Sequence, residues 1–225
     1  MTYLRGLAVL ALTLFTFTAW PAMAQVDQQK TVNSAASTIE RLKTDNNFQR
    51  SFLDDLHKSR ALLIIPDLYK GGFILGGQYG NGILMVHQPD GSWSYPAFYT
   101  MEGGSLGLQI GLESSSIVFI INSDKALQAI LANQFRFGAD AGVTVLVVGA
   151  GMGASTTSNL GADITAVALS GVGLYGGLSL EGTALSPRES WNASYYGQNV
   201  SSRAIVLDNA MNNPQADRLR DILAR

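Results

Sequence analysis

Glycine is distributed unevenly along this chain, and that distribution constrains the fold more than any other feature of the sequence. Residues 71–182 contain 22 of the 24 glycines but only nine charged residues. Glycine is unfavourable inside helices, so this stretch favours strands and tight turns. The flanking residues 25–70 contain 13 charged residues and no glycine. Residues 183–225 contain nine charged residues and one glycine. We therefore expect a β-rich centre between two helical ends.

The first 24 residues have the pattern of a secretory signal peptide. Arg5 precedes an apolar stretch over residues 7–17, and Ala22-Met23-Ala24 forms an A-x-A cleavage site before Gln25. This stretch is shorter than the roughly 20 residues that a membrane-spanning helix needs. We expect cleavage after Ala24 and a periplasmic or secreted mature protein. Because no linker divides residues 25–225, we expect them to form a single domain.

The first part of the mature chain, residues 25–60, has helical periodicity. One face of the first predicted helix is apolar: Val32, Ala35, Ala36, Ile39 and Leu42. The opposite face is polar and carries Lys30 and Arg41. A break is expected at residues 45–47, followed by a second helix over residues 48–60.

The centre of the chain is predicted to form strands at residues 61–65, 82–87, 93–99, 106–112, 116–121, 143–148, 162–169 and 172–180. Pro89-Asp90-Gly91 predicts a hairpin turn, and Ser123 predicts the cap of a helix over residues 125–134. Further helices are expected over residues 202–211 and after Asn213-Pro214. The predicted fold class is α+β, with a glycine-rich, mainly antiparallel twisted sheet or half-barrel and helices at both chain ends.

The sequence lacks the residue patterns of conventional active sites. The chain has no cysteine and only two histidines, His57 and His87, so no metal-ligand spacing is present. Residues 149–154 match a dinucleotide-binding glycine motif, but turn residues follow where that motif requires a helix. Ser105 sits in a G-x-S-x-G sequence, yet both histidines precede it and a strand follows. We predict no catalytic residue, no metal and no cofactor, and therefore no enzyme.

Many short stretches, in order and at matching spacing, resemble the SYLF-domain family over about three quarters of the chain. They are residues 59–66, 70–77, 80–82, 91–96, 104–111, 137–140, 173–182, 192 and 195–197. The resemblance implies a domain that binds anionic phospholipids, and some yeast members of the family are described as actin-binding. In eukaryotic members a basic amphipathic N-terminal helix contributes to lipid contact. Here the corresponding segment also carries acidic residues, among them Asp27 and Glu40.

Phosphate headgroups are bound by lysine and arginine at a membrane surface. The candidate lipid-binding residues lie on the first predicted helix and near its junction with the sheet: Lys30, Arg41, Lys43, Lys58, Arg60 and Lys70. The expected partner is phospholipid or a membrane surface. Nucleic acid is not expected, because the net charge is −2 and no basic excess exists.

Two other functions are compatible with these patterns. A protein-interaction or structural module of the cell envelope could use the charge-poor sheet to bind a protein partner. A small outer-membrane β-barrel also has glycine-rich alternating strands, although such a barrel would not be expected to end in a charged helix.

Overall fold

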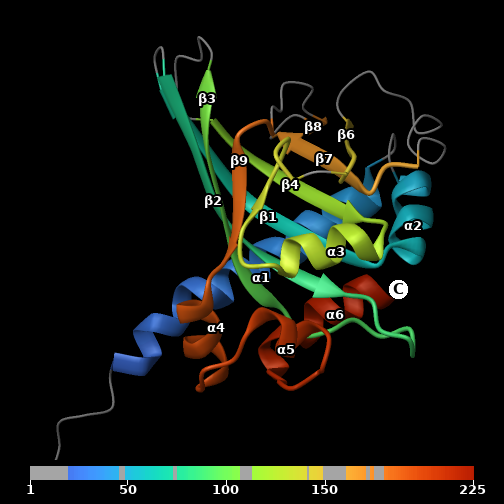
Figure 1. The fold of residues 1–225 in the computed structure, drawn as a ribbon. Coiled ribbons are helices and arrows are strands. Elements are labelled where there is room, and N and C mark those ends of the chain that lie inside the picture. The colour runs from blue at the N-terminus through green and yellow to red at the C-terminus, as the bar shows by residue number, and fades with distance from the viewer. Residues whose placement is uncertain are drawn as a thin grey trace, which may run out of the picture.

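One curled sheet organises the protein (Figure 1). The computed structural model describes residues 20–45, 49–72, 75–106, 113–140, 142–148, 161–170, 173–174 and 180–225. Within them, nine strands form a half-barrel in the order β5-β9-β3-β2-β1-β4-β7-β6, with β8 paired to β7. All pairs are antiparallel except β6 with β7. The predicted α+β class and the mainly antiparallel half-barrel are confirmed.

The elements follow one another along the chain with these bounds. The strands are β1 Ala61–Gly72, β2 Leu75–Val86, β3 Ala97–Leu106, β4 Glu113–Ile121, β5 Phe135–Arg136, β6 Val145–Val148, β7 Ile164–Ser170, β8 Gly173–Leu174 and β9 Thr183–Pro187. The helices are α1 Trp20–Thr44, α2 Gln49–Lys58, α3 Asp124–Leu131, α4 Glu189–Tyr196, α5 Ser202–Val206 and α6 Asp217–Ala224, which a short 3₁₀ turn over Pro214–Ala216 precedes. In the described part of the chain, no helix combines the length and apolar character needed to cross a bilayer.

The sheet buries apolar side chains on both faces. One face contains Leu63 and Phe119 and packs against α5 and against α3, which contributes Ile130. The other packs against α1, α2, α4 and α6 and contains Ile64 and Phe98. The predicted apolar face of the first helix is confirmed, because all five of its residues are at most 2% exposed. Helical spacing sufficed for this prediction, since a helix on a sheet buries a single stripe of side chains.

Several element boundaries differ from the sequence prediction. The first strand does not end at Pro66 but continues to Gly72, and the helix from Ser202 ends at Val206 rather than near residue 211. Helix α4 was not predicted, because its sequence shows no helical amphipathicity. Of the strands predicted at residues 106–112 and 172–180, only residues 106, 173, 174 and 180 are described. Residues 1–19 and 149–154 lie outside the described residues. Helix α1 begins at Trp20 and runs through the predicted cleavage site.

A β-bulge at Pro66 changes which way the rest of β1 faces. The register of β1 against β2 shifts between Ile64 and Asp67, and the register against β4 shifts between Ile65 and Leu68. One extra residue in a strand reverses the inside–outside alternation of all residues that follow. Leu68 consequently joins the α3 face of the sheet. Asp67 and Tyr69 are placed on the α1 face.

A carboxylate network ties the start of α3 to the β6–β7 pair. Asp163 accepts hydrogen bonds from the Ser123 hydroxyl at 2.6 Å and from the Thr144 backbone N–H at 2.9 Å. It also pairs with Lys125 at 2.8 Å, and its side chain is only 12% exposed. These donors, Lys125 first, hold the pKa of Asp163 well below its usual range.

We predict that Asp163→Asn lowers the free energy of unfolding by about 2 kcal/mol at pH 7, because donors now aimed at a carboxylate lose a charged acceptor. Because the pKa of Asp163 is lowered in the folded state, its ionisation stabilises the fold fully at pH values above the unfolded-state pKa of about 4. This stabilisation is lost as the pH falls below that value. Urea unfolding at pH 7 and pH 3 should show the gap between wild type and variant shrinking by about 1 kcal/mol. The prediction would be contradicted if the difference in unfolding free energy between wild type and variant were the same at pH 7 and pH 3. Asp208→Asn, which changes an exposed carboxylate, is the control.

Candidate functional site

The six predicted cations do not form one cluster. Lys30 and Arg41 are exposed and line the same groove beside α1. Lys43 is half-buried and its ammonium donates to the backbone carbonyl of Ile222. Burial, with Arg225 nearby, lowers the pKa of Lys43. This lysine therefore holds α6 against α1 rather than facing an open surface.

The other three cations lie away from that groove. Lys58 ends α2 and is exposed. Arg60 is exposed and forms an ion pair with Asp124 at 2.8 Å. Lys70 is only 7% exposed, so its side chain lies within the protein rather than at the surface. The bulge at Pro66 explains this placement, because it turns Lys70 to the same face as Leu68.

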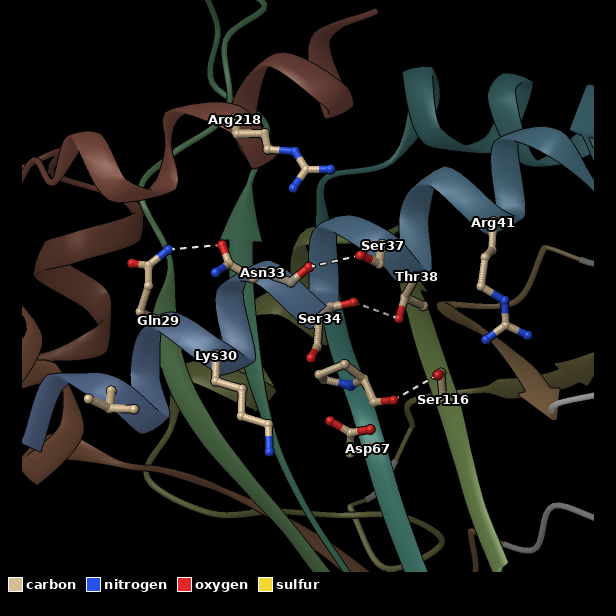
Figure 2. A pocket seen from close by; sticks show the side chains of 12 residues that line it. Gln29, Lys30, Asn33, Ser34, Ser37, Thr38, Arg41, Asp67, Ser116 and Arg218 are labelled. Carbon is tan, nitrogen blue, oxygen red and sulfur yellow. Dashed lines mark hydrogen bonds between the residues drawn. The ribbon is translucent and has the colours of Figure 1, made fainter. Parts of the chain in front are cut away.

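The groove that holds Lys30 and Arg41 is the larger of two neighbouring cavities beside α1, with a volume of about 820 Å³. Its walls are the polar side of α1, the Pro66-Asp67 bulge, Ser116 of β4 and Arg218 of α6 (Figure 2). The bulge is held in place by the Ser116 hydroxyl, which donates to the Pro66 carbonyl at 2.7 Å. Such a volume falls within the range of small-molecule sites.

Positive charge predominates in this groove. Lys30, Arg41 and Arg218 face a single lining carboxylate, Asp67. Arg218 is already paired with Glu40 at 3.1 Å. Lys30 has no ion pair or hydrogen-bonding partner for its ammonium among the described residues. Figure 2 shows Lys30 and Arg41 leaving α1 on the side of Asp67 and Ser116, with Lys30 near one end of the groove. An anion can therefore contact Lys30 without first displacing a partner of this lysine.

A second, smaller cavity of about 270 Å³ adjoins the groove and shares Lys30 and Asp67 with it. Its other charged lining residues are Asp27 of α1 and Arg188 before α4. Tyr69 of β1 and Tyr79 of β2 also line it, and they are direct cross-strand partners.

Exposed large apolar side chains gather around the same two cavities. In the part of the chain that the structure describes, they are Val26, Tyr69 and Tyr79, which are 60%, 52% and 44% exposed. Val26 lines the groove and the tyrosines line the smaller cavity. Tyrosine rings beside cations are typical of surfaces that contact a lipid headgroup region.

Sequence reasoning found Lys30 and Arg41 but missed Asp67, the tyrosine pair, Arg188 and Arg218. Helical spacing placed the α1 cations on one face. No local pattern reveals that a bulge turns Asp67 and Tyr69 toward α1. Arg188 and Arg218 come from a different end of the chain and reach the site only through tertiary packing.

The two histidines lie away from the groove beside α1. No group of three or more His, Asp or Glu side chains that could hold a metal is found among them. His57 and His87 line a separate cavity of only about 30 Å³, in which His87 stacks on Trp93 at 5.0 Å. The Ser105 side chain and the glycine motif at residues 149–154 fall outside the described part.

Comparison with known proteins identifies one family. Its profile, described as Ysc84, Las17-binding protein actin regulator, matches residues 102–225. Ser116, Arg188 and Arg218 lie within that match, whereas α1, Asp67 and both tyrosines precede it.

Three relatives match over a longer range. Protein YSC84 of Saccharomyces cerevisiae is 32% identical over 170 residues, which are 75% of this chain and 36% of the yeast protein. LAS seventeen-binding protein 3 of the same yeast is 30% identical over 172 residues, or 76% and 37% of the two chains. SH3 domain-containing YSC84-like protein 1 of Homo sapiens is 30% identical over 167 residues, or 74% and 48%. The chain therefore spans less than half the length of these relatives.

Proposed function

This chain belongs to the Ysc84 (SYLF) family, and we propose that it is a non-enzymatic module of the cell envelope that binds phospholipid surfaces through the groove beside α1. The observation that carries the proposal is the coincidence of unpaired Lys30, exposed Arg41 and exposed Val26 on one groove. Cations near an anionic leaflet contribute about 1 kcal/mol each, and apolar side chains that enter the interface add to this.

The proposal narrows the predicted set of cations. Lys30 and Arg41 are its phosphate-binding residues, assisted by Arg218. Lys58 and Arg60 lie outside the groove, so they contribute to membrane binding only through long-range attraction to an anionic leaflet. Lys43 and Lys70 support the fold, because one holds α6 and the other is buried.

We also propose that residues 1–24 are a signal peptide cleaved after Ala24, which would place the mature protein in the periplasm or outside the cell. The sequence pattern supports this proposal. Cleavage would leave Val26, Lys30 and Arg41 on the mature protein. Mass spectrometry of protein secreted by its own host should find Gln25 at the N-terminus.

Binding to membranes can be tested with vesicles of increasing phosphatidylglycerol content. We predict that Lys30→Ala and Arg41→Ala each weaken co-sedimentation about fivefold and that the double variant loses about 25-fold, from about 1 kcal/mol per cation. Arg136→Ala removes an exposed cation from β5, outside the groove, and is the matched control. Equal binding at every vesicle composition, or an equal loss in the control, would contradict the proposal.

Protein binding is the second candidate function. The names of the family and of one yeast relative refer to binding of Las17, and the family is also described as an actin regulator. The groove and the smaller cavity together are lined by arginine and tyrosine, which are residue types that dominate protein interfaces. Co-purification of a stoichiometric protein, lost in the Lys30 and Arg41 variants while vesicle binding is absent, would favour this candidate.

A further inference from the structure

We propose that the smaller cavity beside the groove recognises an amine, so that the headgroup bound here is a phosphorylated amine such as phosphocholine or phosphoethanolamine. This inference rests on the proposed function, since it places the phosphate of the same headgroup at Lys30. The cavity is lined by Asp27, Lys30, Asp67, Tyr69 and Tyr79, among others.

Two carboxylates of the smaller cavity have no partner among the described residues. Asp67 is half-buried at the bulge, and Asp27 is exposed on α1. Neither side chain forms an ion pair or a hydrogen bond with another described residue. A half-buried carboxylate without a partner is unfavourable, and a cation that enters the cavity would compensate it.

Two exposed tyrosines form another wall of the smaller cavity. Tyr69 and Tyr79 face each other across β1 and β2, and directly paired side chains have Cβ atoms about 5 Å apart. The Tyr79 hydroxyl donates to Asn81 at 3.1 Å and accepts from Arg188 at 3.2 Å. The phenol is thereby held at its polar end, while Tyr79 as a residue stays 44% exposed. Tyrosine faces beside carboxylates attract quaternary and primary ammonium groups.

Arg188 does not compete for this position. Its guanidinium lies 3.7 Å from the centroid of the Trp191 ring and donates to Asn81 as well as to Tyr79. Its charge is therefore directed at the wall of the cavity. Of the two cations that line the smaller cavity, Lys30 is the one whose ammonium has no ion pair or hydrogen bond among the described residues.

The two cavities match the two charges of a zwitterion. Lys30 and Asp67 belong to both, so a phosphate beside Lys30 in the groove places an attached amine within reach of Asp67 and the tyrosines. A purely anionic headgroup would have no group to place beside Asp67 and the tyrosines, so it would gain nothing from the smaller cavity. The charge pattern therefore favours a headgroup that carries both signs.

The test uses soluble and membrane-bound probes with the mature chain. Calorimetric titration with phosphorylcholine, phosphorylethanolamine and glycerol phosphate measures the headgroup alone, and vesicles of phosphatidylethanolamine or phosphatidylglycerol measure the lipid surface. Asp67→Asn and Tyr69→Leu should each weaken binding of the phosphorylated amines at least fivefold. Both variants should leave glycerol phosphate binding within twofold, and Asp208→Asn, an exposed carboxylate outside both cavities, should change nothing. Circular dichroism confirms that each variant is folded.

The outcomes separate the inference from the proposed function. Binding to phosphatidylglycerol vesicles alone, or phosphorylated-amine binding unaffected by both variants, overturns the inference and leaves the proposed function standing. Selective loss in both variants supports the inference. Soluble phosphorylated amines that bind without any vesicle binding support the amine site and overturn membrane binding. The absence of binding to every probe overturns both.

Discussion

An alanine at position 82 should destabilise this protein by at least about 3 kcal/mol, because the bulge leaves no room for a methyl group there. A Cβ built on Gly82 would lie 2.3 Å from the backbone oxygen of Ile64 and 2.3 Å from the Cδ1 of Ile65. The first of these atoms belongs to the main chain of the adjacent strand, so no side-chain rotation relieves the contact. Either β1 and β2 separate locally or the bulge is lost.

Thermal and urea unfolding of Gly82→Ala measure this loss, with Gly104→Ala as the matched control. Gly104 lies on the neighbouring strand β3, where an added Cβ meets nothing within 4 Å. The control should change stability by no more than about 0.5 kcal/mol. Equal effects of the two substitutions would contradict the account of the bulge. If Gly82→Ala still folds, its binding of phosphorylcholine should also weaken, because Asp67 and Tyr69 follow the bulge.

Removing the side chain of Asn192 should cost about 2–4 kcal/mol of stability. Asn192 is fully buried in α4, where its Oδ1 accepts from the backbone N–H of Phe98 at 2.8 Å and its Nδ2 donates to the Ser202 hydroxyl at 3.1 Å. Alanine would leave a buried strand N–H and a hydroxyl without these partners, which costs about 1–3 kcal/mol for the first alone. The side chain thus joins β3, α4 and α5.

Asn199→Ala is the control for this second prediction, because Asn199 is exposed in the following loop. Chemical denaturation should show a change within about 0.5 kcal/mol for the control and a lower midpoint for Asn192→Ala. A wild-type midpoint in Asn192→Ala would show that water replaces the amide without cost. The same burial implies that Asn192 is inaccessible to glycosylation in the folded protein, although Asn192-Ala193-Ser194 has the sequence of an acceptor site.

Secondary structure that depends on local periodicity could be predicted from the sequence. The apolar stripe of α1, the turn at Pro89-Asp90-Gly91 and the caps at Ser123 and Asn213 all agree with the structure, because each depends on residues within one or two turns of chain. Gly91 has the positive φ of 84° that the turn requires. The caps hold backbone N–H groups three and two residues onward.

The candidate site required information that no short segment contains. Lys30 and Arg41 were predictable as neighbours because they share a helix face. Arg188 and Arg218 join them from segments 147 to 188 residues away in sequence, and only the packing of α4 and α6 against the α1 face brings them there. The distribution of charges could show that the ends of the chain are helical, but not that they meet.

The sequence alone determined the layout of helical ends around a glycine-rich sheet, because glycine and charge content set local conformational preference along the whole chain. The tertiary structure decided which polar side chains of β1 reach the surface. Without the extra residue at Pro66, strict alternation would put Asp67 on the α3 face and Lys70 on the α1 face. The bulge exchanges them, so that Asp67 lines both cavities and Tyr69 lines the smaller one, while Lys70 is buried. A single-residue register shift decides this, and its stability depends on the Ser116 hydrogen bond and on the space left by Gly82, which lie on the two neighbouring strands.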